Sequence, residues 1–216
     1  MTQQQRMPPL GRDGWTHEIR TLFTILEGPA AYEEGSRSNA LLTLARHPDL
    51  AGSFFKFNGR LLLKGLIPAR LREIAILRVA WLTRSRYEWA QHVRIALLPD
   101  ALSKEQIEAF RRGEAADLSG EGLLTQDHIE AVKQGADDPI WSELERFTVR
   151  AVDENLASQR VSDDTWTGLR ALLSEQELIE LLFVIGVYSM LAFIFNSLGI
   201  EPEEAQQSLA ADLPAS

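Results

Sequence analysis

Apolar residues recur at every third or fourth position along most of this chain, which is the period of an amphipathic α-helix. This spacing predicts helices over residues 15–26, 39–46, 50–64, 68–82, 85–98, 103–112, 125–133, 139–155, 162–173 and 174–198. No segment alternates apolar and polar residues convincingly with the two-residue period of a strand. The pattern therefore predicts an all-α fold.

The segments between these helices predict how the domain is organised. Residues 1–12 are polar and contain two consecutive prolines, so we expect a flexible N-terminal arm. Residues 13–202 read as a single helical domain whose core motif lies at 68–98, and residues 203–216 as a C-terminal tail. Residues 113–122 are rich in glycine and acidic residues and are the clearest predicted loop.

Two helical stretches resemble each other when the chain is shifted by 104 positions. The shift places Glu73 on Glu177 and His92 on Asn196, and both stretches read as two apolar helices around a short polar break. A degenerate internal repeat would explain the match. Chance agreement between two leucine-rich helices explains it equally well.

Composition narrows the possible partners. The 216-residue chain is 45% hydrophobic and 25% charged, as in an ordinary globular protein, and its net charge is −9. A negative chain is a poor match for nucleic acid or an anionic membrane surface, because both require a field of Lys and Arg. We therefore expect no nucleic-acid or membrane partner.

The chain contains no cysteine, which excludes disulfides, thiolate metal sites and thiol catalysis. The N-terminal residues lack the apolar segment of a signal peptide. The longest uncharged apolar run, residues 181–195, is shorter than the roughly 20 residues that a bilayer span needs. We interpret it as a buried core or interface helix and expect a cytoplasmic protein.

The candidate chemistry is concentrated between residues 71 and 97. Ser85, Glu88 and His92 are spaced three and four residues apart, which places them on one face of a helix. Glu73 lies on the preceding helix, and a helical hairpin would return it to that face. Carboxylates in an apolar setting have raised pKa values and imidazoles titrate near neutrality, so these groups suit general acid–base catalysis.

Structural explanations of the same residues remain open. Ser85 and Glu88 form the pattern of a capping box, and Glu88 and His92 could simply pair along the helix. Glu73 could pair at the surface with a neighbouring arginine, Arg70 or Arg72. These explanations need no catalytic site.

Three arginines flank the hairpin and could hold a substrate carboxylate: Arg78, Arg84 and Arg86. Each could equally be an ordinary surface arginine. A metal site would have to combine Glu73 and Glu88 with His92, and no second histidine lies nearby in the sequence. We therefore expect no metal ion at this position.

The segment REIAILRVAWLTRSRYEWAQHVRIA, with the surrounding residues 40–112, resembles the carboxymuconolactone decarboxylase-like superfamily, which includes the AhpD-type alkylhydroperoxidases. Residues 173–200 resemble the C-terminal part of its longer members. The retained motif residues are Glu73 and His92. In the peroxidase branch a Cys-x-x-Cys pair lies between them, and this chain has Ser85 and Glu88 at those positions.

The resemblance implies an AhpD-like helical bundle and the chemistry of the branch without redox cysteines. A cofactor-free decarboxylase-like lyase would act on a small carboxylated lactone or related carbonyl compound. His92 would be the general acid or base, Glu88 and Glu73 would orient it or share its proton, and Ser85 and the arginines would bind substrate. The resemblance also implies a homo-oligomer, either a trimer, a hexamer or a dimer.

Two alternatives remain beside the lyase. One is a non-catalytic ligand-binding or scaffold protein that has kept only the fold. The other is residual alkylhydroperoxidase activity, which the absence of cysteine disfavours because serine cannot form the required sulfenic acid.

Overall fold

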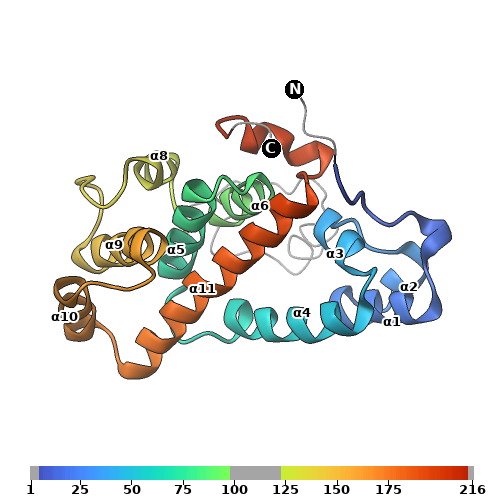
Figure 1. Ribbon diagram of the computed structural model, residues 1–216, viewed down its shortest axis with the longest axis horizontal. Coiled ribbons are helices and arrows are strands. Elements are labelled where there is room, and N and C mark those ends of the chain that lie inside the picture. The colour runs from blue at the N-terminus through green and yellow to red at the C-terminus, as the bar shows by residue number, and fades with distance from the viewer. Residues whose placement is uncertain (1–4, 98–122, 214–216) are drawn as a thin grey trace.

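The computed structural model describes residues 5–97 and 123–213, and these residues form helices without a strand among them (Figure 1). The all-α fold predicted from the apolar periodicity is therefore confirmed. The helix predicted at 103–112 and the loop predicted at 113–122 lie outside the described residues.

The elements in chain order are η1 (Arg12–Gly14), α1 (His17–Glu27), α2 (Ala31–Glu34), α3 (Asn39–Leu44), α4 (Pro48–Leu63), α5 (Ala69–Leu82), α6 (Arg86–Ala96), α8 (Gln126–Gln134), α9 (Glu143–Ser158), α10 (Asp163–Leu172), α11 (Glu175–Leu198) and η2 (Glu204–Ala210). Most boundaries follow the caps that the sequence predicted. α9 begins four residues later than expected, because Ser142 forms the capping box with Glu145.

α5 lies at the centre of the molecule. It packs against α11, α9, α6 and α8, and Figure 1 shows it between α9 and α11. Its residues from Ile74 to Leu77 are completely buried. A helix that is covered on all sides must be apolar all round, which explains why α5 has so few polar positions. The polar exceptions, Glu73 and Arg78, therefore stand out.

α11 corrects one prediction. It is a continuous 24-residue helix, whereas the repeat hypothesis requires a break near Ser189. The Ser189 hydroxyl donates to the Ile185 carbonyl at 2.7 Å, so this serine is accommodated within the helix. Glu177, the counterpart of Glu73 in the proposed repeat, caps the start of α11. The two stretches are therefore built differently.

α11 is long and apolar enough, by length and composition, to cross a membrane. The core helix of a globular protein meets the same criteria, and half of the apolar stretch of α11 is buried inside the protein. Residues such as Leu181, Val184 and Leu191 pack into the main core with α5. This side of α11 is the buried core helix that the sequence indicated.

Both described ends of the chain contact the helical body. The Met7 amide donates to the Leu198 carbonyl at 3.0 Å, and Arg46 donates to the Pro8 carbonyl at 3.0 Å. At the other end, η2 packs on α6 and buries Ala210 and Leu213. The sequence predicted a flexible arm and a separate tail from their composition. Contacts made through backbone groups cannot be predicted in this way, because they do not depend on residue type.

Candidate functional site

A tight turn between α5 and α6 brings Glu73 and His92 together. Arg84 adopts a left-handed conformation with φ 55°, and the Ser85 amide donates to the Ala80 carbonyl at 2.9 Å. α6 therefore folds back along α5. His92 Nδ1 lies 2.7 Å from Glu73 Oε2, although the residues are 19 positions apart. Their exposed fractions are 6% and 0%.

The second oxygen of Glu73 faces an arginine. Arg72 Nε lies 3.4 Å from Glu73 Oε1, an ion-pair distance without a hydrogen bond. The sequence suggested Arg72 as a possible partner for Glu73 at a surface, and the structure shows a buried carboxylate with this neighbour. Glu73 is thus flanked by a guanidinium and an imidazole, and it fixes the orientation of the His92 ring.

Ser85 and Glu88 do not form the capping box that their spacing suggested. The Ser85 backbone has ψ 91°, whereas Ser142, Ser162 and Ser174, whose side chains do cap helices, have ψ near 160°. The Ser85 hydroxyl therefore accepts no amide of α6. The capping-box interpretation of this pair is wrong.

Glu88 is a buried carboxyl group without hydrogen bonds. Both of its oxygens and the Ser85 hydroxyl lack a partner in the described part of the chain, and Glu88 is only 2% exposed. Burial raises the pKa of Glu88 to about 8, and the nearby Ser85 hydroxyl lowers it in part. Glu88 is therefore mostly protonated at neutral pH, because an unpaired charge is costly in an apolar interior.

α11 contributes Tyr188 to the same cluster. Its ring meets the His92 imidazole edge to face, with centroids 5.0 Å apart and planes at 86°. Burial raises the pKa of Tyr188, and the charge of Glu73 and, at a pH where it has ionised, that of Glu88 raise it further. The phenol therefore stays neutral. The sequence marked Tyr188 only as a polar residue in an apolar helix.

Asn58 on α4 is a member that the sequence analysis missed. Its side chain lies beside the Tyr188 hydroxyl, where it favours the ionised phenol, and it is itself only 8% exposed. Its Oδ1 atom has no hydrogen-bond partner in the part of the chain that the structure describes. In the sequence, Asn58 could have been noticed only as a polar residue within the apolar pattern of α4. Its place in the cluster depends on the packing of α4 near the α5–α6 hairpin, which the sequence pattern does not specify.

The flanking arginines do not join this cluster. Arg78 forms two bonds to Asp153, at 2.6 and 3.1 Å, and another to the Val132 carbonyl at 2.7 Å. It lies five residues after Glu73, which places it roughly 140° around the helix. Arg86 binds Glu201 and two C-terminal carbonyls, and Arg84 lies exposed at the turn. The first two arginines therefore anchor neighbouring segments.

The clustered groups can exchange protons. His92 is held through Nδ1 by Glu73, which leaves Nε2 to act on a ligand. Glu88 is a neutral acid on the same face of α6, one turn earlier. Among residues 5–97 and 123–213, no group of three or more His, Asp or Glu side chains is arranged to hold a metal ion.

Comparison with known proteins supports the same fold. Residues 48–136 match the model of the carboxymuconolactone decarboxylase family, a segment that includes the whole α5–α6 hairpin. No curated protein matches the chain.

Among solved structures, an uncharacterised peroxidase-related protein with an AhpD core from Ralstonia eutropha superposes with a TM-score of 0.66 at 16% identity, over 97% of each chain. A peroxidase-related protein from Silicibacter sp. gives 0.68 at 14% identity, over 96% of this chain and 97% of that one. The debrominase Bmp8, in a cysteine-to-alanine variant bound to 2,3,4-tribromopyrrole, superposes with a TM-score of 0.67 at 16% identity, over 99% of this chain and 100% of that one. The chain, which has no cysteine, therefore folds as an AhpD-like helical bundle and contains a segment, residues 48–136, that matches the carboxymuconolactone decarboxylase family.

Proposed function

We propose that this protein is a cofactor-free proton-transfer enzyme of the decarboxylase-like branch, acting on a small lactone or related carbonyl compound. The observation that carries the proposal is the buried pair of Glu73 and His92 beside Glu88, a buried carboxyl group with a raised pKa and no hydrogen-bond partner among residues 5–97 and 123–213. Perturbed, unsatisfied groups of this kind are a frequent property of active sites.

The geometry suggests a division of roles. His92 Nε2 would remove the proton from the carbon next to a substrate carbonyl, and the electron pair of that C–H bond would move toward the carbonyl oxygen. Glu88 would donate its proton to the resulting enolate, and the proton held by His92 would restore Glu88 at the end of the cycle. Glu73 would stabilise the imidazolium that forms in between.

A decarboxylation would use the same groups. The bond between the substrate carbon and its carboxylate would break, carbon dioxide would leave, and the electron pair would remain as an enolate. Glu88 would then protonate that carbon. A carboxylated lactone remains a candidate substrate, although Arg78 and Arg86 are engaged elsewhere. Recognition would therefore depend on the carbonyl group more than on a guanidinium clamp.

Peroxidase activity does not follow from the neighbours named peroxidase-related. A thiol peroxidase needs a cysteine thiolate, and this chain has no cysteine. The debrominase complex contains a small cyclic ligand, which supports a small ring as the ligand class for this fold. We expect no consumption of hydroperoxide with a dithiol reductant.

The alternative is a protein that binds a ligand or serves as a scaffold without catalysis. Burial favours it, because Glu73, Glu88 and His92 are each at most 6% exposed. A ligand would have to reach side chains that are covered in the described structure. The test must therefore separate binding from proton transfer.

Proton transfer can be measured before the natural substrate is known. The protein is incubated in D₂O with muconolactone, carboxylated muconolactone and simple β-keto acids, and deuterium uptake next to the carbonyl is followed by proton NMR. We expect uptake with at least one compound, a loss of about 10²-fold or more in His92→Gln, and no change in the exposed control His17→Gln. Binding without exchange on any compound would favour the non-catalytic alternative.

A further inference from the structure

The outer side of α11 is an exposed apolar stripe. Ile179, Phe183, Met190 and Phe193 are 57%, 52%, 44% and 74% exposed. Together with Gly186 they follow steps of four, three, four and three residues, the spacing of a coiled-coil seam. We call these five residues the α11 seam. The opposite side of the helix is buried against α5, so the seam is a second, uncovered apolar side.

Gly186 leaves a notch in the middle of the seam. A side chain at this position would meet no atom within 4 Å, so nothing inside the described chain requires glycine there. Glycine in a helix interior destabilises the helix relative to alanine. An open groove of about 470 Å³ surrounds the notch, lined entirely by residues of α11. The notch would allow a surface from outside the chain to approach the helix backbone.

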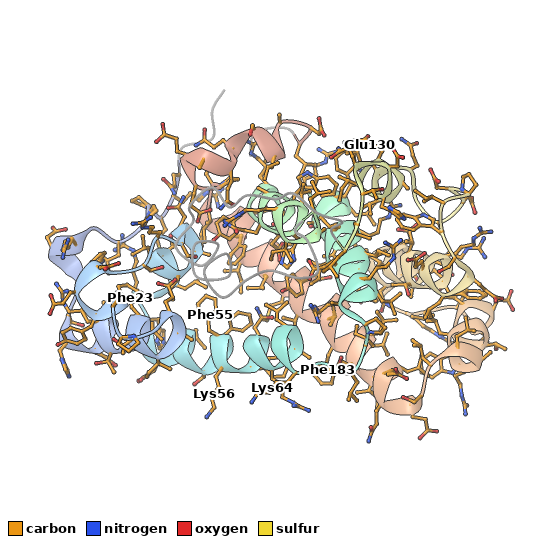
Figure 2. All side chains as sticks on the ribbon, turned by 180° about the vertical axis from the view of Figure 1, so that it is seen from behind. Phe23, Phe55, Lys56, Lys64, Glu130 and Phe183 are labelled. Carbon is orange, nitrogen blue, oxygen red and sulfur yellow. The ribbon has the colours of Figure 1, made fainter. Side chains whose placement is uncertain are left out.

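The apolar surface extends onto α4. The Phe57 ring meets the Phe183 ring with centroids 6.0 Å apart, and Figure 2 shows Phe183 near the C-terminal end of α4. Phe57 and the large seam residues together expose roughly 600 Å², taking their exposed fractions of ordinary side-chain areas. A stable interface buries about 800 Å² per partner. This surface supplies most of that area and equals the largest apolar patches of typical monomers.

We propose that the α11 seam is the interface between two copies of this chain, paired antiparallel about a two-fold axis at Gly186. A two-fold interface requires a surface that is complementary to itself. Ile179 and Phe193 both lie seven residues from Gly186, so the axis would place Ile179 of one copy against Phe193 of the other. The two glycine notches would face each other and allow close contact of the helices.

A lipid surface fits this side of α11 less well. Helices that lie on membranes carry a polar, Lys- and Arg-rich side opposite the apolar one, and the opposite side of α11 is buried in protein. Glu175, Glu177 and Glu180 stand at the N-terminal end of the helix. The chain also carries a net charge of −9, which an anionic bilayer would repel.

The first test is the mass in solution. Light scattering at micromolar concentration should give twice the 24.2 kDa chain mass for the wild type and the single-chain mass for Phe193→Glu. The matched control is Ile25→Glu, since Ile25 is 73% exposed but lies on α1; it should remain a dimer. A monomeric wild type, or an assembly that Phe193→Glu leaves unchanged, would overturn the proposal.

The second test uses the absence of native cysteine. Under mild oxidation Gly186→Cys should form a disulfide-linked dimer with itself. Ile179→Cys and Phe193→Cys should cross-link when mixed and much less when each is alone, because a disulfide needs Cα atoms within about 7 Å. Cross-linking of Ile179→Cys to itself as readily as to Phe193→Cys would contradict the antiparallel arrangement.

The third test addresses lipid directly. Phosphatidylcholine vesicles, with and without phosphatidylserine, are floated through a density gradient with the wild type and with Phe193→Glu. We expect neither protein to float. Flotation of the wild type alone would assign the seam to a lipid surface and overturn the dimer.

Discussion

Two carboxyl groups lie beside α6, Glu203 from the C-terminal segment and Glu88 on the helix itself, and their hydrogen bonding differs. On one side, Glu203 accepts hydrogen bonds from the Asn39 amide, the Tyr87 hydroxyl and the Gln91 side chain. On the other side, Glu88 is almost fully buried and accepts none in the described chain. A carboxylate that accepts several hydrogen bonds holds segments of the chain together. A buried carboxyl group without hydrogen bonds lowers the stability of the fold, so its presence calls for a functional explanation.

This contrast assigns different roles to the two sides. The Glu203 side fixes the C-terminal segment over α6, with Arg86 adding bonds to the Ala210 and Leu213 carbonyls. The Glu88 side faces the Glu73–His92 pair and is the proposed site of proton transfer.

Glu88→Gln should reduce deuterium exchange by about 10²-fold or more, since glutamine keeps the shape of the neutral acid but cannot donate a proton to an enolate. Glu203→Gln, on the other side of α6, should leave the exchange rate within about twofold. The rates are compared by proton NMR on the same compound. Equal losses in the two variants would remove the distinction between the sides.

Glu203→Ala should lower the free energy of unfolding by roughly 2 kcal/mol, because it leaves three donors without their acceptor. The control is the neighbouring Glu204→Ala, whose side chain is exposed and which should change stability by less than about 0.5 kcal/mol. Urea unfolding measures both. A stable Glu203→Ala variant would mean that these bonds contribute little.

Stability should depend on pH through Glu88. Its folded pKa of about 8 lies above the unfolded value near 4.3, so its contribution is complete below about pH 4 and is lost as pH rises toward 8. Glu88→Gln removes this loss. The free energy of unfolding of the variant, measured with urea, should therefore rise relative to that of the wild type between pH 5 and 8. Above pH 9 the difference between the two should be constant. Parallel profiles would show that Glu88 titrates normally.

Ser85→Ala should change stability by less than about 0.5 kcal/mol or increase it slightly, because the buried Ser85 hydroxyl has no hydrogen-bond partner among the described residues. Ser174→Ala should cost about 1 kcal/mol, because Ser174 caps α11. The two serines share the Ser-x-x-Glu spacing. If both variants lost the same stability, Ser85 would be a cap in solution.

The sequence predicted most helices and their ends because the caps are local. Ser162 and Ser174 mark the starts of α10 and α11 within one residue. The prediction of caps from the sequence failed where the same residue pattern occurs in a different structural environment. Ser85-x-x-Glu88 and Ser174-x-x-Glu177 have the same letters, but the first is buried and has a rotated backbone.

The candidate site was partly accessible to the same reasoning. Helical spacing placed Ser85, Glu88 and His92 on one face, and the hairpin turn brought Glu73 to it. Asn58 and the contact of Tyr188 depend on how α4 and α11 pack, which no local pattern specifies. The roles of Arg78 and Arg86 were equally hidden, because their partners lie 75 and 115 residues away.

We predict that Glu88 is held protonated at neutral pH inside the site. Carbon-13 NMR of the glutamate side-chain carboxyls, with the spectrum of Glu88→Gln to identify the resonance, follows this group through a pH titration. We predict a midpoint near pH 8 for Glu88 in the folded protein. A midpoint near 4.3, at the same pH as the exposed glutamates, would show that Glu88 is ionised at neutral pH and is not the proposed acid.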